Sequence, residues 1–149
     1  MKDLYLDTVS SIERLHRLFL EVVKNELDRQ GIHDMNNVQA LILYNLGKSQ
    51  LTVSELTNRG YYLGSNASYN LRKMIQNGYI DQEVSVHDRR AIVVKLSARG
   101  LDFYKKFDAA MNRQVTIFIE KNIPLADLQN ATNLLRQMEA FWSEFLIRR

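Results

Sequence analysis

The sequence predicts a mainly helical fold with a small β element of two or three strands, and three observations support this prediction. Apolar residues recur every three or four positions through most of the 149 residues, as they do in helices with one buried face. Between residues 80 and 96 the period shortens to two, which is typical of β-strands. With 46% hydrophobic and 25% charged residues, a chain of this length can bury one core without disulfide bonds, and it contains no cysteine.

The first third of the chain predicts two helices. Residues 4–30 place apolar side chains at helical spacings with charged residues between them, and Gly31 ends this long amphipathic helix. The segment from Asn36 to Leu46 forms a second helix, which is compact, largely buried and ended by Gly47.

The next two helices are short. Thr52 and Glu55 have the spacing of a capping box, in which each side chain accepts a hydrogen bond from the other residue's backbone amide, and they predict a helix over residues 52–58. Ser65 can cap a following helix that reaches Gln76. One side of that helix is apolar, and the other is rich in hydrogen-bond donors, namely Asn66, Ser68, Tyr69, Arg72 and Lys73.

A hairpin with a basic tip follows. The alternating segments 80–86 and 91–96 flank residues 87–90, whose sequence is HDRR. The net charge of the chain is only +3, but residues 52–100 carry seven basic and four acidic side chains, so the central third holds the positive excess. The alternative for this tip is a solvated turn whose arginines contact only water.

Two long helices end the chain. The helical period returns at residue 98 and continues to residue 121, and Pro124 fits the first turn of a final helix. Apolar residues of this last helix alternate by three and four in heptad fashion. The stripe could be core within one chain, but we expect it to form a dimer interface that includes Leu128, Leu135, Met138, Trp142 and Phe145.

This order of elements describes a winged helix-turn-helix flanked by long dimerisation helices. The second helix of such a motif enters the major groove of DNA, and the hairpin, or wing, lies over the backbone or the minor groove. Residues 34–100 would form the DNA-binding domain, with residues 1–33 and 101–149 as the helical dimerisation region. The donor-rich helix face could also be ordinary polar surface. The side chains that we expect to contact double-stranded DNA are Ser65, Asn66, Ser68, Tyr69, Arg72, Lys73, Arg89 and Arg90.

Several short motifs in these elements resemble the MarR family of bacterial transcriptional regulators, and the order of elements matches that family over nearly the whole chain. The most specific motif is the wing, because residues 88–90 and 96–100 are similar to the family pattern D-x-R followed by L-T-x-x-G, with Ser97 in place of threonine. Residues 78–80 match the turn after the recognition helix. Residues 64–70 are similar to the LdtR and PetP regulators within the family.

The resemblance implies roles and partners as well as a fold. Asp88 would brace the wing, and Arg90 would be the residue inserted into the groove. Gln39 with Leu43 fits the helix before the motif. Family members are homodimers whose first and last helices intertwine, and many release DNA on binding a small, often aromatic, ligand. The resemblance therefore implies a repressor or activator that binds a pseudo-palindromic operator as a homodimer.

Aromatic residues between the dimerisation helices and the DNA-binding unit could bind such an effector. Aromatic walls with a few hydroxyl groups suit a planar aromatic or phenolic ligand that is weakly acidic. The alternative is that the tyrosines only fill the core beneath the recognition helix. The candidate ligand-binding residues are His16, Phe19, Tyr44, Tyr61, Tyr62 and Leu63.

The sequence lacks the patterns of enzymes, metal sites and membrane spans. It has no glycine-rich phosphate loop, no G-x-S-x-G, no H-E-x-x-H and no cysteine nucleophile, so we expect neither catalysis nor a cofactor. The three histidines form no metal-spaced cluster with carboxylates. No apolar stretch approaches the span length of about 20 residues, and the N-terminal residues do not resemble a signal peptide, so we expect a cytoplasmic protein. The remaining alternative is a winged-helix adaptor that binds proteins instead of DNA.

Overall fold

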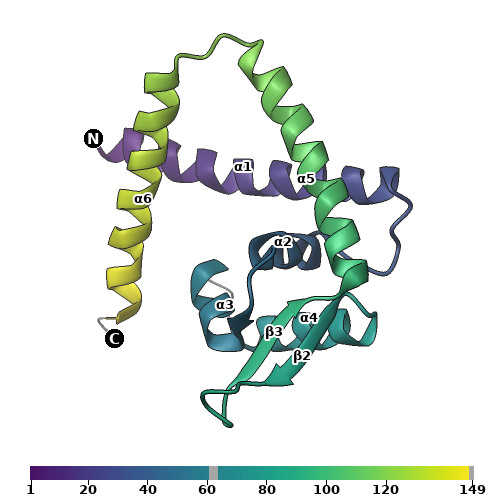
Figure 1. Ribbon diagram of the computed structural model, residues 1–149. Coiled ribbons are helices and arrows are strands. Elements are labelled where there is room, and N and C mark those ends of the chain that lie inside the picture. Colours follow the sequence, from purple (N-terminus) through teal and green to yellow (C-terminus); the bar gives the residue numbers. More distant parts are fainter. Residues whose placement is uncertain (61–63, 148–149) are drawn as a thin grey trace. The chain divides into compact units, whose positions relative to one another are not determined.

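The computed structural model describes residues 1–60 and 64–147, and it divides the chain into two compact units, Met1–Ala110 and Met111–Arg149. The fold is mainly helical with a three-stranded antiparallel sheet, as the sequence predicts. In chain order (Figure 1), the elements are α1 (Lys2–Arg29), α2 (Asn37–Leu46), β1 (Leu51–Thr52), α3 (Val53–Gly60), α4 (Gly64–Gln76), β2 (Ile80–Val84), β3 (Ile92–Leu96), α5 (Ala98–Ile119) and α6 (Leu125–Ile147).

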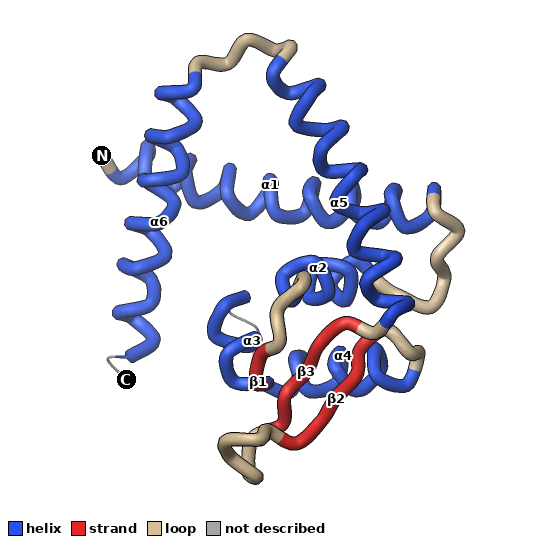
Figure 2. The backbone as a smooth tube through the Cα atoms, in the orientation of Figure 1, coloured by secondary structure: helices blue, strands red, loops and turns tan. Residues whose placement is uncertain are grey.

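The sheet has the strand order β1-β3-β2, with β3 in the centre (Figure 2). The strands β2 and β3 form the expected hairpin, in which Gln82 lies opposite Val94. The strand β1 pairs with the other edge of β3, so that Leu51 also lies opposite Val94. The capping-box spacing predicts a helix from residue 52, whereas the structure ends β1 at Thr52 and begins α3 at Val53. Pairing with a distant strand decides this boundary.

Local signals at helix ends act as the sequence predicts. The backbone amide of Glu55 donates to Thr52 Oγ1 at 3.1 Å, and the backbone amide of Thr52 donates to Glu55 Oε1 at 3.2 Å, which forms the capping box of α3. Asn36 and Gln39 form a second capping box at the start of α2. After α1, Gly31 adopts a left-handed φ of 70°, which glycine reaches without steric strain.

The core of the first unit surrounds α2, which packs against α1, α3, α4 and β3. Within α2, Ile42, Leu43 and Leu46 are almost completely buried. Burial of this apolar surface is the main force that holds α4 and the sheet against α2. The other buried side chains of this core include Val23, Leu27, Leu56, Leu71, Met74, Ile80, Val94, Phe103 and Phe107.

A tight backbone contact joins the start of α5 to the turn after α4. The Ser97 backbone amide donates to Tyr79 O at 3.0 Å, and the Ser97 hydroxyl donates to Gly78 O at 2.5 Å and accepts from the Gly100 amide at 3.1 Å. A Cβ atom on Gly100 would lie 2.2 Å from Tyr79 O, so only glycine permits this approach. Serine and threonine both carry this hydroxyl group, which explains why Ser97 can replace the threonine of the pattern L-T-x-x-G.

The second unit contains the last part of α5, a turn and α6. Asn122 has a positive φ of 56° in this turn, a conformation that asparagine tolerates better than most residues. The carbonyl of Pro124 accepts from the backbone amides of Asp127 and Leu128 at 3.0 and 3.3 Å, which starts α6. Although α6 is apolar, the described residues contain no helix with an apolar stretch long enough to cross a membrane.

Candidate nucleic-acid interface

Helix α4 separates its residues into a buried face and an exposed face, as predicted. Ala67, Leu71 and Met74 are buried. Ser65 belongs to α4, but its side chain lies outside the described residues. Exposed amide, hydroxyl and cationic groups on one helix face can hydrogen-bond to base edges and phosphates. The predicted side chains Asn66, Ser68, Tyr69, Arg72 and Lys73 are all exposed.

A buried hydrogen bond holds α4 against α2. Gln39 Nε2 donates to Asn70 Oδ1 at 3.1 Å, and the two side chains are 6% and 8% exposed. The Oε1 atom of Gln39 also accepts from the Asn36 backbone amide at 3.1 Å. An unpaired buried amide is unfavourable, so this pairing favours one arrangement of the two helices. Asn70 is not among the predicted functional residues, although a polar residue between Ala67 and Leu71 on the apolar face is a signal in the sequence.

Hydrogen bonds around Asp88 order the tip of the wing. The Ser85 backbone amide donates to Ala91 O at 2.9 Å, and the Ala91 amide donates to Asp88 O at 3.0 Å. The Asp88 carboxylate accepts from the Arg90 backbone amide at 2.9 Å. The Ser85 hydroxyl accepts from the backbone amides of His87 and Asp88 at 3.2 and 3.4 Å. These contacts are the ones that a bracing role of Asp88 requires, and that role stays a prediction.

The cationic side chains of α4 and of the tip of the wing are Arg72, Lys73, Arg89 and Arg90, and all four are exposed. Within residues 1–60 and 64–147, none of them forms an ion pair with a carboxylate. Their charge is therefore available to an external anion. Guanidinium and ammonium groups bind phosphate oxygens by charge-assisted hydrogen bonds, and guanidinium groups also match the edge of guanine.

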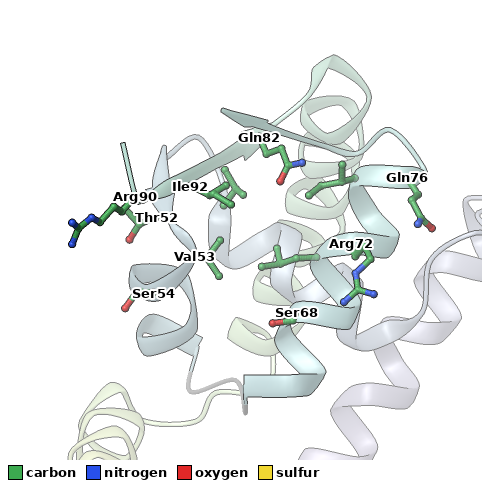
Figure 3. Close-up of a pocket in the computed structure, with 13 residues that line it drawn as sticks. Thr52, Val53, Ser54, Ser68, Arg72, Gln76, Gln82, Arg90 and Ile92 are labelled. Atoms are coloured by element: carbon green, nitrogen blue, oxygen red, sulfur yellow. The ribbon is translucent and has the colours of Figure 1, made fainter. Parts of the chain in front are cut away.

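The start of α3, helix α4 and the wing line one groove with a volume of about 600 Å³. Figure 3 shows Arg72 of α4 and Arg90 of the wing on opposite sides of this groove. Of the predicted DNA contacts, Ser68, Arg72 and Arg90 line the groove. The side chains of Asn66, Tyr69, Lys73 and Arg89 lie on the same two elements but do not line it.

Tyr44 is engaged in a polar and aromatic cluster between α2 and α5. Its hydroxyl donates to Asp108 Oδ1 at 2.6 Å, and its ring centroid lies 5.0 Å from that of Phe107 and 5.3 Å from that of Tyr104. The hydrogen bond to Asp108, together with burial, raises the pKa of Tyr44 to about 12. The hydroxyl therefore stays protonated and remains a donor at neutral pH.

Of the other predicted ligand-binding residues, the structure describes only His16 and Phe19. His16 is exposed and Phe19 is half-buried in the single chain, whereas Tyr61, Tyr62 and Leu63 lie outside the described residues. Among the residues that the structure does describe, no group of three histidine or carboxylate side chains could hold a metal ion.

The predicted interface stripe of α6 is only partly exposed in one chain. Leu128, Leu135 and Phe145 are 46%, 48% and 63% exposed, and Trp142 is half-buried. Met138 is 8% exposed, so side chains of the same chain already cover it. The burial of Met138 agrees with the alternative that part of the stripe is core within one chain. The interface itself stays a prediction.

Comparison with known proteins agrees with this geometry. Residues 33–91 match the MarR family. Over 138 residues the chain is 30% identical to the exopolysaccharide II synthesis transcriptional activator ExpG of Rhizobium meliloti (strain 1021), a match that covers 93% of this chain and 71% of ExpG. The chain belongs to the MarR family. It is a MarR-type DNA-binding transcriptional regulator, and this family consists of regulators and not of enzymes.

Several solved structures share the fold. Staphylococcus aureus MarR in complex with salicylate and kanamycin is 22% identical with a TM-score of 0.75, and the match covers 95% of this chain and 93% of that one. Streptococcus pneumoniae FabT in complex with DNA is 15% identical with a TM-score of 0.70, covering 95% and 99%. AbsC of Streptomyces coelicolor is 18% identical with a TM-score of 0.76, covering 93% and 94%. The predicted winged helix-turn-helix fold is thus confirmed.

Proposed function

We propose that this MarR-family protein binds a pseudo-palindromic operator as a homodimer, with α4 in the major groove and the wing over the adjacent backbone or minor groove. The observation that carries the proposal is the shared groove, which brings Arg72 of α4 and Arg90 of the wing to one concave surface. Their unpaired charges suit phosphate and base contacts. Each chain has one reading helix, so two chains would address half-sites about 10 bp apart, one helical turn of DNA.

The same groove indicates which part of the chain would bind DNA and which part would form the dimer. All residues that line the groove fall within residues 34–100, which we propose as the DNA-binding domain. Residues 1–33 and 101–149 would hold the two chains together. The contacts proposed for DNA are Ser65, Asn66, Ser68, Tyr69, Arg72, Lys73, Arg89 and Arg90. The similarity of residues 64–70 to the LdtR and PetP regulators stays a prediction about the branch within the family.

The direct test is to select bound fragments from a library of the source genome and to footprint the enriched duplex. Two protected half-sites related by a dyad, with one dimer bound per site, are the expected result. Protection of one unsymmetric half-site would contradict the dimeric geometry. Failure to retain any duplex, even at low salt, where phosphate contacts are strongest, would favour the adaptor alternative.

We further propose that a small aromatic or phenolic acid modulates DNA binding. The support is the aromatic cluster of Tyr44, Tyr104 and Phe107, together with the salicylate in the structure of S. aureus MarR. A ligand changes DNA affinity only if it binds one arrangement of the reading helices better than another, with a typical coupling of about 1–3 kcal/mol.

Salicylate and related phenolic acids can be screened by thermal shift, and the DNA titration repeated with each hit. A hit should weaken or strengthen DNA binding, and Tyr44→Ala should abolish its stabilising effect. Tyr44→Phe, which keeps the ring and removes the hydroxyl, separates stacking from hydrogen bonding. Stabilisation without any change in DNA affinity would contradict regulation by that ligand.

A further inference from the structure

A charged cluster outside the groove holds the C-terminal end of α4. We call it the Asp34–Arg99 cluster, and it consists of Asp34, Asn77, Tyr79 and Arg99. Asp34 lies between α1 and α2, Asn77 and Tyr79 lie between α4 and β2, and Arg99 lies in the first turn of α5. Residues from two connections and from the start of α5 therefore meet at one point.

The hydrogen bonds of this cluster form a closed network. Tyr79 Oη donates to Asp34 Oδ1 at 2.7 Å, and Arg99 Nη2 donates to Asp34 Oδ2 at 3.0 Å. Arg99 Nη1 donates to the backbone carbonyl of Asn77. The side-chain amide of Asn77 donates to the backbone carbonyl of Asp34 at 2.9 Å. One guanidinium group thus bridges a carboxylate and the chain that leaves α4.

The surroundings of Asp34 and Tyr79 keep the carboxyl group of Asp34 charged and the hydroxyl group of Tyr79 protonated. Partial burial opposes ionisation of Asp34, but the hydrogen bond from Tyr79 and the charge of Arg99 outweigh it and lower the pKa of Asp34. Burial and the hydrogen bond to Asp34 raise the pKa of Tyr79 to about 12. The guanidinium carbon lies 4.2 Å from the ring centroid of Tyr79, which is 3% exposed. At neutral pH the carboxylate is charged and both of its donors are in place.

The Asn77 carbonyl lies just beyond the last turn of α4, where a cation also interacts favourably with the helix dipole. The start of α5, which carries Arg99, is held to the turn after α4 by the hydrogen bonds that Ser97 donates to Tyr79 O and Gly78 O. Neither partner of the ion pair is deeply buried, since the side chains of Arg99 and Asp34 are 54% and 41% exposed. Solvent screening makes such a pair weak as a source of global stability. Its geometry, however, ties the end of α4 to two other elements.

We propose that Arg99 is a positioning residue for DNA recognition, which holds the C-terminal end of α4 against α5 and the α1–α2 connection and thereby sets how α4 enters the groove of DNA. The inference rests on the proposed function and deepens it. Arg99 acts through Asn77 and Asp34 and does not contact DNA.

The experiment measures the affinity of the full-length protein for its selected duplex and for unrelated duplex across a salt series, at a temperature where circular dichroism shows every variant folded. Arg99→Ala should weaken specific binding by about three- to tenfold, as for residues that share a network. Affinity for unrelated duplex and the salt slope should not change. Arg99→Lys should restore part of the loss, because an ammonium group keeps the charge but not the planar fork.

Two further variants make the test specific. Asp34→Asn should weaken specific binding in the same way, and the double variant with Arg99→Ala should be no worse than Arg99→Ala alone. Lys106→Ala is the matched control, because it removes an exposed ion pair with Asp102 at 3.1 Å on the same helix. Lys106→Ala should leave both affinities unchanged.

Each other outcome overturns the proposal in a different way. A parallel loss of specific and non-specific affinity with a smaller salt slope would make Arg99 a direct phosphate contact. Unchanged affinities in all Arg99 and Asp34 variants would reduce the cluster to a structural contact, while the proposed function would stand. A wild-type protein that binds no duplex would remove the proposed function and this inference together. If Arg99→Ala does not fold, Arg99→Lys and Asp34→Asn decide between these outcomes.

Discussion

Helices α4 and α6 place their apolar residues in opposite environments. Helix α4 buries Ala67, Leu71 and Met74 within one chain and exposes polar side chains. In the described part of α6 only Met138 is buried, and its exposed large apolar side chains include Leu134, Leu135, Phe141, Phe145 and Leu146. Monomeric proteins rarely expose so large an apolar surface. The apolar face of α4 is therefore covered within one chain, whereas much of the apolar surface of α6 is exposed in one chain. Helix α1 resembles α6 in this respect, because Leu15 and Leu18 are 63% and 51% exposed.

A hollow in the second unit also exposes apolar surface. The end of α5 and the start of α6 enclose a space of about 530 Å³, and almost all of its lining is apolar. Val115, Phe118 and Leu128 line it, and each of these side chains is more than 40% exposed. Apolar surface of this kind gains free energy when another apolar surface excludes water from it.

The largest expected effect comes from removing the surface of α6. Deletion from Leu128 onward should convert a dimer to a monomer and reduce specific DNA affinity by about 10²- to 10⁴-fold through lost avidity. Sedimentation and DNA titration measure both effects. Leu135→Glu, which puts a charge on the exposed stripe, should weaken the dimer in the full chain, and Asn133→Glu on the same helix is the control. A truncated or Leu135→Glu protein that still sediments as a dimer would contradict this interface.

A smaller effect is expected at the wing, which lies in the first unit. Arg90→Ala should weaken DNA binding more than Arg89→Ala, and it should flatten the salt dependence by about one phosphate equivalent per subunit. The reason is that Arg90 lines the groove and Arg89 does not. Asp88→Ala should cause a smaller loss, because it removes only the hydrogen bond to the Arg90 amide. Equal affinities of wild type and Arg90→Ala across the salt series would reject the assignment.

Helix α4 carries an asparagine on its buried face, Asn70, and another on its exposed face, Asn66. The same substitution at both positions compares how much each face contributes to stability. Asn70→Ala leaves the amide of Gln39 without its partner, so it should lower the free energy of unfolding by about 1–3 kcal/mol. Asn66→Ala, at an exposed position, should change it by less than about 0.5 kcal/mol. Thermal or denaturant unfolding of the two variants measures the difference. Equal stabilities would mean that the bond between Gln39 and Asn70 does not hold the helices together.

The smallest expected effect is the pH dependence of the stability that Asp34 contributes. The pKa of Asp34 is lowered in the folded chain, so its contribution to stability is present above the unfolded-state pKa and is lost as pH falls through the folded pKa. Asp34→Asn should therefore be slightly less stable than wild type near neutral pH, and the difference should shrink in acid. Denaturant unfolding of both proteins between pH 7 and acid checks this. A constant difference at every pH would contradict the role of the charge.

Much of the fold was predictable because its signals are local. The capping box of Thr52 and Glu55, the end of α1 at Gly31 and the hairpin around Asp88 all depend on residues within a few positions of one another. The polar face of α4 follows from the helical period alone. The short strand β1 was less predictable, since Leu51 becomes a strand only through its pairing with Val94.

The sequence by itself determined which segments form helices, which faces of them are apolar and where the positive charge gathers, because capping, periodicity and turn geometry act over short stretches of chain. Only the tertiary structure decided which distant side chains meet. Gln39 reaches Asn70 across 31 positions, and Asp34 reaches Arg99 across 65. Such contacts depend on how α1, α2, α4 and α5 pack around one core, and packing between distant elements leaves no local pattern in the sequence.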